Sequence, residues 1–187
     1  MIIVYTGNGK GKTTAALGLA LRAAGWGKRI LIIQFLKKQT SGEINFFKDC
    51  QALNKQISKY TNKQIKIKQF GTKDFVDPKK LRPIDFQETK KGFDYSLFAI
   101  HNSLSKGKLC LFDIVILDEI NVAVEFGLIT KEEVLNLLTQ KPKEMTIVLT
   151  GRWACPEIIE VADLVTEFKE IKHPFKKGEK TRKGIDY

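Results

Sequence analysis

The sequence predicts an α/β fold, a three-layer sandwich in which helices cover both faces of a mainly parallel sheet. Short runs rich in isoleucine, valine and leucine alternate along the chain with longer segments of helical composition, which is the order expected for such a sheet. Most of these runs are apolar at every position, as strands buried on both faces are. The first run leads into a glycine-rich loop, and a helix-forming segment follows the loop.

The first part of the chain predicts two buried strands, an edge strand and two helices. Gly25 and Gly27 end the first helix, and Ser41 is a candidate cap for the second. Residues 65–70 alternate between apolar and polar, which is typical of a less buried or edge strand. The expected strands are Ile2–Tyr5, Arg29–Phe35 and Ile65–Phe70, and the expected helices are Lys12–Ala24 and Glu43 to about Ile57.

The second part begins with an irregular, lysine-rich loop at Gly71–Pro83, in which Pro78 and Pro83 break regular structure. A loop of this length is often a functional lid. Helices are expected from Asp85 to about Lys106, from a cap at Thr130 to about Thr139, and from Pro156 to about Ala162; strands are expected at Leu109–Leu117, Met145–Leu149 and Asp163–Ile171. We expect one domain over residues 1–187, in which 172–187 form a basic C-terminal tail.

The glycine-rich loop has the composition of a phosphate-binding loop, or P-loop, and so favours a RecA-like P-loop NTPase fold. Its glycines let the backbone approach phosphate oxygens, and the helix that follows points free N–H groups and its positive dipole end at the anion. A glycine-rich turn that merely contains Gly-Lys-Thr is the alternative. The residues expected to hold the phosphates are Gly7, Asn8, Gly9, Lys10, Gly11, Lys12, Thr13 and Thr14.

The loop departs from the standard pattern G-x-x-x-x-G-K-[ST] at one position. Thr6 stands where the first glycine belongs, and Gly7 comes one residue late. The chemistry of the rest is intact, because Lys12 adds a full positive charge and the Thr13 hydroxyl can ligate Mg²⁺.

Two carboxylates and an arginine follow later strands. Asp118 and Glu119 close an apolar run at the Walker B position, where an aspartate commonly holds Mg²⁺ directly or through water; a solvated turn is the alternative. Arg152 follows another strand, so its guanidinium should reach the ligand side and pair with phosphate or another anion. An arginine bridging to an acidic neighbour would be a purely structural role. We therefore assign Thr13, Asp118 and Glu119 to the metal, and catalysis to Lys12 and Glu119.

Less specific signals surround these residues. Lys37, Lys38 and Glu43 follow the second strand and are placed at the same edge of the sheet. Three phenylalanines near the irregular segment favour either an apolar wall for a flat ligand or ordinary core packing. They are Phe70, Phe75 and Phe86.

Composition limits the remaining classes. The net charge of +11 suits anionic ligands, and nucleic acid is the alternative partner, although no basic recognition helix or interleaved aromatic pattern supports it. Three widely spaced cysteines argue against a disulfide framework and a zinc site. No signal peptide and no apolar run of roughly 20 residues is present, so we expect a cytoplasmic protein without membrane spans.

The sequence of the loop and its flanks, from Val4 to Ala16, resembles the N-terminal signature of the P-loop corrinoid adenosyltransferases. In that family, too, the loop begins Thr-Gly, so the departure at Thr6 belongs to the resemblance. Later segments resemble the family's blocks in the same order: Gln34-Phe35 with Gly42-Glu43, Val115–Glu119, Leu149–Arg152, Ala162–Glu167, Lys172–Phe175 and Gly184–Tyr187.

This resemblance implies a specific reaction. Cobalt(I) of a reduced corrinoid attacks C5′ of ATP, triphosphate leaves, and the Co–C bond of adenosylcobalamin or its precursor forms. The resemblance also implies Mg²⁺ as cofactor, with Mn²⁺ in its place as an option, a homodimer, and a flavoprotein reductase as partner. Some members carry Gly-Phe-Thr-Trp near the corrinoid, whereas Phe75 is the sole aromatic residue of Gly71–Val76 here; Phe75 is thus assigned to the corrinoid site.

Two other functions remain possible at this point. The glycine loop with Asp118-Glu119 also suits an ordinary P-loop phosphotransferase or ATPase, which would release ADP. The positive charge also suits an ATP-dependent switch that binds nucleic acid.

Overall fold

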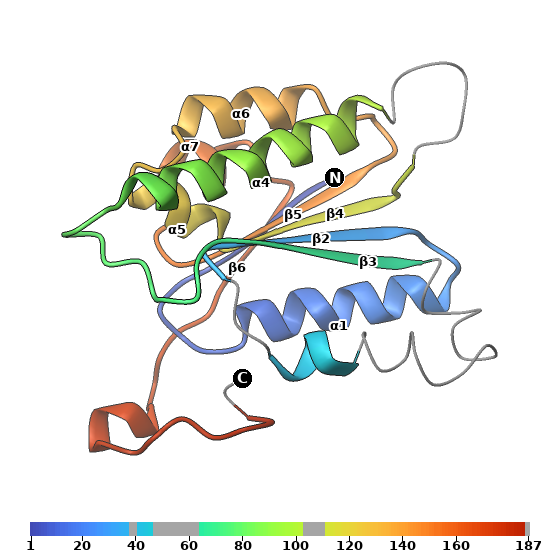
Figure 1. Cartoon of the computed structure of the whole chain (residues 1–187). Coiled ribbons are helices and arrows are strands. Elements are labelled where there is room, and N and C mark those ends of the chain that lie inside the picture. The colour runs from blue at the N-terminus through green and yellow to red at the C-terminus, as the bar shows by residue number, and fades with distance from the viewer. Residues whose placement is uncertain (38–40, 47–63, 103–110, 186–187) are drawn as a thin grey trace.

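The computed structural model describes every residue except 38–40, 47–63, 103–110 and 186–187. Six strands among the described residues form one sheet, and every strand pair is parallel (Figure 1). The predicted α/β class is confirmed. The strands are β1 (Ile2–Thr6), β2 (Ile30–Phe35), β3 (Ile65–Phe70), β4 (Ile114–Asp118), β5 (Thr146–Thr150) and β6 (Leu164–Glu167), in the spatial order β3-β2-β4-β5-β1-β6.

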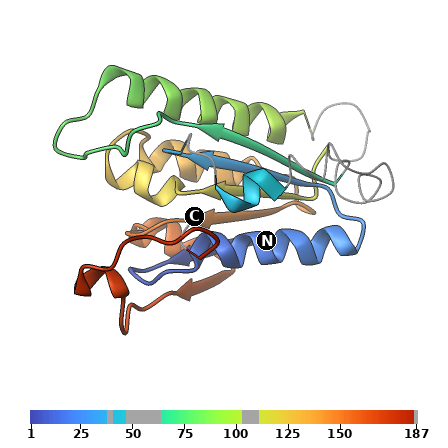
Figure 2. The same cartoon turned by 60° about the horizontal axis from the view of Figure 1, so that its bottom comes forward.

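Helices lie on both faces of this sheet. The helices are α1 (Lys12–Gly25), α4 (Pro83–His101), α5 (Ile120–Glu125), α6 (Lys131–Thr139) and α7 (Pro156–Glu160), with a 3₁₀ turn, η1, at Pro174–Lys177 and a helical segment at 42–46. α1 covers one face, and α4 to α7 cover the other (Figures 1 and 2). No helix within the described residues is long and apolar enough to cross a membrane.

The central strands send alternate residues into two separate cores. Ile30 and Ile32 of β2 pack with the alanines of α1, whereas Leu31 and Ile33 pack with Phe93 of α4 on the other face. All four β2 residues are essentially inaccessible to water. A strand buried on both faces needs an apolar residue at every position, which explains the continuous apolar run.

The sheet brings the carboxyl ends of its strands to one edge. Gln34 near the end of β2 pairs in register with Asp118 of β4, and Tyr5 near the end of β1 pairs with Thr150 of β5. β1 and β2 are consecutive in sequence but have β5 and β4 between them in the sheet. The loops after β1, β2, β4 and β5 therefore meet at a topological switch point, where open α/β sheets bind ligands.

Several predicted boundaries need correction. α4 begins at Pro83, which occupies the first helical turn, so this proline starts the helix and does not break it. The predicted extension of α4 to Lys106 and the predicted start of a strand at Leu109 fall on residues 103–110, outside the described residues. The strand there, β4, begins only at Ile114.

Other corrections concern the later elements and the segment after β2. β6 ends at Glu167 and α7 at Glu160, so both are shorter than predicted, and the short helix α5 was not predicted. Ser41 directly precedes the helical segment and its carbonyl accepts from the Asn45 N–H at 3.0 Å, as at an N-cap position, but its buried hydroxyl has no hydrogen-bond partner among the described residues, so the side chain does not cap the helix. The helix expected over Glu43–Ile57 is described only at 42–46.

The predicted cap at Thr130 is present, and a single substitution at this residue tests it. The Thr130 hydroxyl accepts a hydrogen bond from the Glu133 N–H at 3.1 Å, and the Glu133 carboxylate accepts one from the Thr130 N–H at 3.0 Å. Thr130→Ala should lower the free energy of unfolding by about 1 kcal/mol, measured by urea denaturation, because an N–H of α6 loses its acceptor. Thr130→Ser keeps the hydroxyl and should unfold like the parent; an equal loss in both variants would contradict the capping role.

Candidate active site

The glycine loop is packed against the chain that follows β6. Gly7 has a φ of +95°, and a Cβ there would lie 2.5 Å from the carbonyl oxygen of Phe168. A Cβ at Gly9 would lie 2.7 Å from the same oxygen, which accepts a hydrogen bond from the Gly9 N–H at 2.6 Å. A side chain at either position would push the loop away from this support, so both glycines are required by close approach of the backbone.

Thr6, which replaces the first glycine of the standard pattern, has a structural role. It is the last residue of β1, and its hydroxyl accepts a hydrogen bond from the Ala154 N–H at 3.2 Å. This contact joins the start of the glycine loop to the loop that follows β5. The order of strand, loop and helix is undisturbed, because α1 begins at Lys12.

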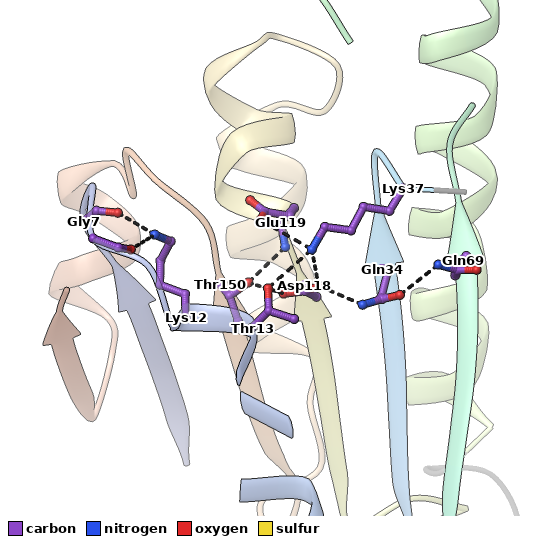
Figure 3. Close-up of polar contacts among 10 residues, drawn as sticks. Gly7, Lys12, Thr13, Gln34, Lys37, Gln69, Asp118, Glu119 and Thr150 are labelled. Carbon is purple, nitrogen blue, oxygen red and sulfur yellow. Dashed lines mark hydrogen bonds and ion pairs between the residues drawn. The ribbon is translucent and has the colours of Figure 1, made fainter. Parts of the chain in front are cut away.

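Lys12 folds back over the glycine loop. Its ammonium donates hydrogen bonds to the carbonyl oxygens of Gly7 and Gly9, each at 2.7 Å (Figure 3). Burial lowers the pKa of Lys12, the charge of Arg152 lowers it further, and Glu119 opposes both. The loop thus holds a nearly buried cation at the place where a phosphate chain would meet it.

Asp118 at the end of β4 accepts four hydrogen bonds although its side chain is only 1% exposed. Oδ1 accepts from the hydroxyls of Thr13 at 2.8 Å and Thr150 at 2.7 Å. Oδ2 accepts from the Gln34 amide at 3.1 Å and the Lys37 ammonium at 3.0 Å (Figure 3). A buried carboxylate requires such partners, and these four tie β4 to α1, β5 and the end of β2.

The same hydrogen bonds continue as a row across four neighbouring strands. Gln69 of β3 donates to Gln34 of β2 at 3.1 Å, so β3, β2, β4 and β5 are linked through side chains at their carboxyl ends (Figure 3). No role was predicted from the sequence for Gln34, Gln69 or Thr150. The available signal was a polar residue near the carboxyl end of each strand, which is clearest for Gln34 in the otherwise apolar β2.

Glu119 leaves the strand in a left-handed conformation, with a φ of +66°. This conformation is uncommon for a residue other than glycine and stores strain. The Glu119 N–H donates to the Thr150 hydroxyl at 3.0 Å. Burial raises the pKa of the Glu119 carboxyl and Asp118 raises it further, whereas Lys37 and Lys12 oppose the shift.

Lys37 joins the three residues assigned to the metal. Its Nζ lies 3.4 Å from the Thr13 hydroxyl, 3.0 Å from Asp118 Oδ2 and 3.6 Å from Glu119 Oε1. Burial lowers the pKa of Lys37, but Asp118 and Glu119 outweigh it and raise the pKa, and Glu43 in the helical segment 42–46 adds to this effect. The structure thus gathers Thr13, Asp118 and Glu119 around one point, while Lys38 lies outside the described residues.

Arg152 lies close enough to Lys12 for its charge to lower the pKa of that lysine. Its guanidinium carbon is 5.9 Å from the centre of the Trp153 ring, which has a left-handed backbone with a φ of +58°. Trp153 lines a hollow of about 420 Å³ beside the glycine loop, together with Thr6, Gly7, Asn8, Ala154, Ile159, Val165 and Glu167. Arg152 is therefore on the ligand side of the sheet, where its position after β5 placed it.

The three phenylalanines of the predicted apolar wall have different environments. Phe70 packs against the core and its ring centre lies 5.9 Å from that of Tyr95. Phe86 is 43% exposed and Phe75 is 88% exposed. Phe70 is therefore a packing residue, whereas Phe75 presents its ring to solvent from the irregular loop 71–82.

Arg82 fastens this loop to the start of α4. Its guanidinium donates to the Thr72 hydroxyl at 2.8 Å, to Asp74 at 3.2 Å and to the buried Asp85 at 2.9 Å. Arg82 also holds the pKa of Asp85 below its usual value through these hydrogen bonds. A single side chain thus connects both ends of the segment that carries Phe75.

Residues 1–187 match the family of ATP:corrinoid adenosyltransferases described as BtuR/CobO/CobP. The chain belongs to this family. It is 33% identical to the corrinoid adenosyltransferase of Escherichia coli K12, over 100% of this chain and 85% of the relative, and 32% identical with the same coverage to corrinoid adenosyltransferase CobA of Salmonella typhimurium. The relative from Pseudomonas aeruginosa is 30% identical over 100% of this chain and 83% of its own length.

A solved structure supports the fold of this corrinoid adenosyltransferase. The KaiC-like protein of Pyrococcus horikoshii aligns with a TM-score of 0.52 and 17% identity, over 91% of this chain and 73% of the other. At that identity the likeness shows the overall α/β fold alone. The family shows the activity, which is ATP-dependent transfer of the adenosyl group to a corrinoid, and it supports neither the phosphotransferase nor the nucleic-acid alternative.

A buried amide beneath the site has no partner among the described residues. Both Asn121 Nδ2 and Asn121 Oδ1 are buried without a hydrogen bond, and the side chain is fully inaccessible. A Cβ at Gly151 would lie 3.0 Å from Asn121 Cβ, so the amide lies under the loop that carries Arg152. Unpaired buried amides are costly, which makes this residue a source of instability at the site.

Asn121→Leu should therefore stabilise the protein. The leucine side chain has the same number of heavy atoms but removes both unpaired polar groups, so we expect the free energy of unfolding to rise by about 1–2 kcal/mol. Urea denaturation measures this change. Asn121→Asp, which keeps the shape and adds a charge, should be destabilised; a leucine variant less stable than the parent would show that the amide has a partner.

Proposed function

We propose that this adenosyltransferase works by attack of the corrinoid substrate's Co(I) on C5′ of ATP, with triphosphate as the leaving group. The Co–C5′ bond forms with the electron pair of Co(I), and the C5′–O5′ bond breaks with its pair going to triphosphate. No general base is required, because no proton is removed. The observation that carries the proposal is the family match, and a cationic glycine loop and a carboxylate cluster at one edge of the sheet support it.

The residues of the glycine loop would stabilise the departing triphosphate. Lys12 contributes a nearly buried cation, and Arg152 lies within electrostatic reach of it. Charge on a leaving group is stabilised most by donors that are already in place, and Lys12 is held by two carbonyl oxygens before any ligand binds. Asn8, Lys10, Gly11 and Thr14 complete the part of the loop that we assign to the nucleotide.

The donor set at the carboxylate cluster fits Mg²⁺, or Mn²⁺ in its place. The converging ligands are all oxygen atoms, from Thr13, Asp118 and Glu119, and hard divalent cations prefer such ligands. Both oxygens of Asp118 already accept hydrogen bonds, so we infer that Asp118 orients the Thr13 hydroxyl and acts through water. Thr13 and Glu119 are then the direct ligands. Bound there, the metal would neutralise charge on the phosphates.

The corrinoid is proposed to lie against the loop 71–82. Phe75 offers an exposed ring there, and an apolar surface at the lower face of the corrinoid would exclude an axial water. The loop follows β3, which is joined to the carboxylate cluster through Gln69 and Gln34. A substrate on this loop therefore lies on the same edge of the sheet as the proposed metal site.

Further proposals rest on the family resemblance. We propose that the enzyme is a cytoplasmic homodimer, that a flavoprotein reductase supplies the reduced corrinoid, and that residues 1–187 form one domain. The free thiol of Cys155 is compatible with a reducing compartment. The basic tail runs on the side of the molecule where α1 begins (Figure 2), so closure over ATP and contact with a second subunit are both compatible with its path.

The identity of the phosphate product tests the reaction. With reduced cobalamin and Mg-ATP, the protein should release triphosphate and form a light-sensitive alkylcobalamin, followed by absorbance spectroscopy. Release of ADP without alkylcobalamin would contradict the proposal.

Lys12→Met should lower kcat roughly 100-fold or more, because a pre-positioned charge opposite the leaving group is lost. Lys91→Met, which removes an exposed charge paired with Glu88 on α4, is the matched control and should leave kcat unchanged.

Arg82→Lys tests the corrinoid assignment. A lysine keeps the charge but cannot bridge Thr72, Asp74 and Asp85 together, so the loop that carries Phe75 should lose its fixed position. We expect the KM for cobalamin to rise about tenfold while the KM for ATP stays unchanged. Arg29→Lys alters another arginine–aspartate pair, with Asp113 just before β4, and is the control. Equal changes in both KM values would place the corrinoid elsewhere.

A further inference from the structure

The ammonium of Lys37 occupies the point around which the proposed metal ligands gather. It donates to Asp118 Oδ2 at 3.0 Å and to the Thr13 hydroxyl at 3.4 Å, and it lies 3.6 Å from Glu119 Oε1 (Figure 3). These are the three side chains assigned to Mg²⁺. One position therefore has two candidate cations, one supplied by the chain and one by solution.

The carboxylates of Asp118 and Glu119 need a nearby positive charge even when no metal is bound. Asp118 is 1% exposed and Glu119 is 24% exposed, and their backbone positions are adjacent. Two neighbouring carboxylates in a poorly hydrated place repel each other strongly unless a positive charge lies between them. Lys12 acts on Glu119 through its charge alone, because its ammonium is hydrogen-bonded to Gly7 and Gly9. Lys37 is the cation that forms ion pairs with both Asp118 and Glu119.

The backbone of Lys37 is fixed, but its side chain has room to move. Leu36, the residue before it, has a left-handed φ of +58°, and the Lys37 N–H donates to the Phe70 carbonyl at 3.4 Å. A Cβ at Gly71 would lie 2.6 Å from the Lys37 nitrogen, so the neighbouring chain packs closely on this backbone. The side chain is 36% exposed and is long and unbranched, so its ammonium can swing without any backbone change.

We propose that Lys37 is an exchangeable counter-ion of the active site. Without nucleotide its ammonium neutralises Asp118 and Glu119; when metal and ATP arrive together, the metal takes that position and Lys37 moves to the triphosphate. This exchange opposes binding of the metal alone and favours binding of the metal together with the phosphate chain. After the exchange, Lys37 contacts the leaving triphosphate as a second lysine besides Lys12. This inference rests on the proposed metal site.

The exchange predicts that one substitution at Lys37 changes the affinities for Mn²⁺ and for triphosphate in opposite directions. Lys37→Met keeps the length of the side chain and removes its charge. Mn²⁺ should then bind to the nucleotide-free protein about tenfold more tightly or better, because its competitor is gone, measured by electron paramagnetic resonance of free Mn²⁺. Inorganic triphosphate in the presence of Mn²⁺ should bind about tenfold more weakly, measured by titration calorimetry, because a cation of the phosphate site is lost.

Two variants control this experiment. Lys37→Arg retains the charge and should keep the weak nucleotide-free binding of Mn²⁺, and Lys91→Met should behave like the parent in both titrations. Should Lys37→Met fold poorly, Lys37→Gln offers a polar neutral side chain for the same pair of measurements. If Lys37 had a purely structural role, Lys37→Met would weaken the binding of both Mn²⁺ and triphosphate. The proposed exchange instead predicts tighter binding of Mn²⁺ and weaker binding of triphosphate.

Three results would overturn the inference. Unchanged or weaker binding of Mn²⁺ to nucleotide-free Lys37→Met would show that Lys37 does not compete with the metal. Unchanged triphosphate binding would show that the lysine does not move to the phosphates. If the parent protein bound no Mn²⁺ even with ATP, the proposed metal site itself would be wrong, and that result is separate from the first two.

Discussion

The candidate active site depends on the burial of one carboxylate, that of Asp118. At 1% exposure it is stable only if hydrogen bonds and a countercharge replace its water. Thr13, Thr150 and Gln34 supply three of the hydrogen bonds, and Lys37 supplies the fourth together with the charge. These donors come from three separate parts of the chain, namely α1, β5 and the end of β2. Satisfying this one group therefore fixes the first turn of α1 relative to the ends of β2, β4 and β5.

Strain is concentrated at the same edge. Leu36, Glu119 and Trp153 follow β2, β4 and β5, and all three have left-handed backbones, each of which costs on the order of 1 kcal/mol or more. The Asn121 amide, which has no hydrogen-bond partner among the described residues, lies next to Gly151 in the loop after β5. Such costs persist only where the surrounding contacts over-determine the conformation. The row of hydrogen bonds through Asp118 provides that constraint, so the stability of the sheet offsets the strain of the loops.

The sequence predicted the positions of local motifs well. The glycines before Lys12-Thr13 and the two acidic residues after an apolar run are recognisable at short range, so their places after β1 and at the end of β4 could be predicted without a structure. Thr150 and Lys37 gain their roles only when β5 and β2 lie on either side of β4, which is a tertiary fact. The support of Gly9 by Phe168 is likewise invisible in sequence, because 159 positions separate the two residues along the chain.

The two proposed substrate surfaces differ in character, and this follows from what each must do. The proposed triphosphate side is built from buried, hydrogen-bonded groups such as Lys12 and Asp118, because charge on a leaving group is stabilised best by donors that do not need to rearrange. The proposed corrinoid side is an exposed loop in which Phe75 is 88% accessible. A bulky planar substrate needs an open approach, so its surface cannot be prebuilt in the same way. Arg82 resolves the conflict, because it fixes the base of the loop and leaves the aromatic ring free.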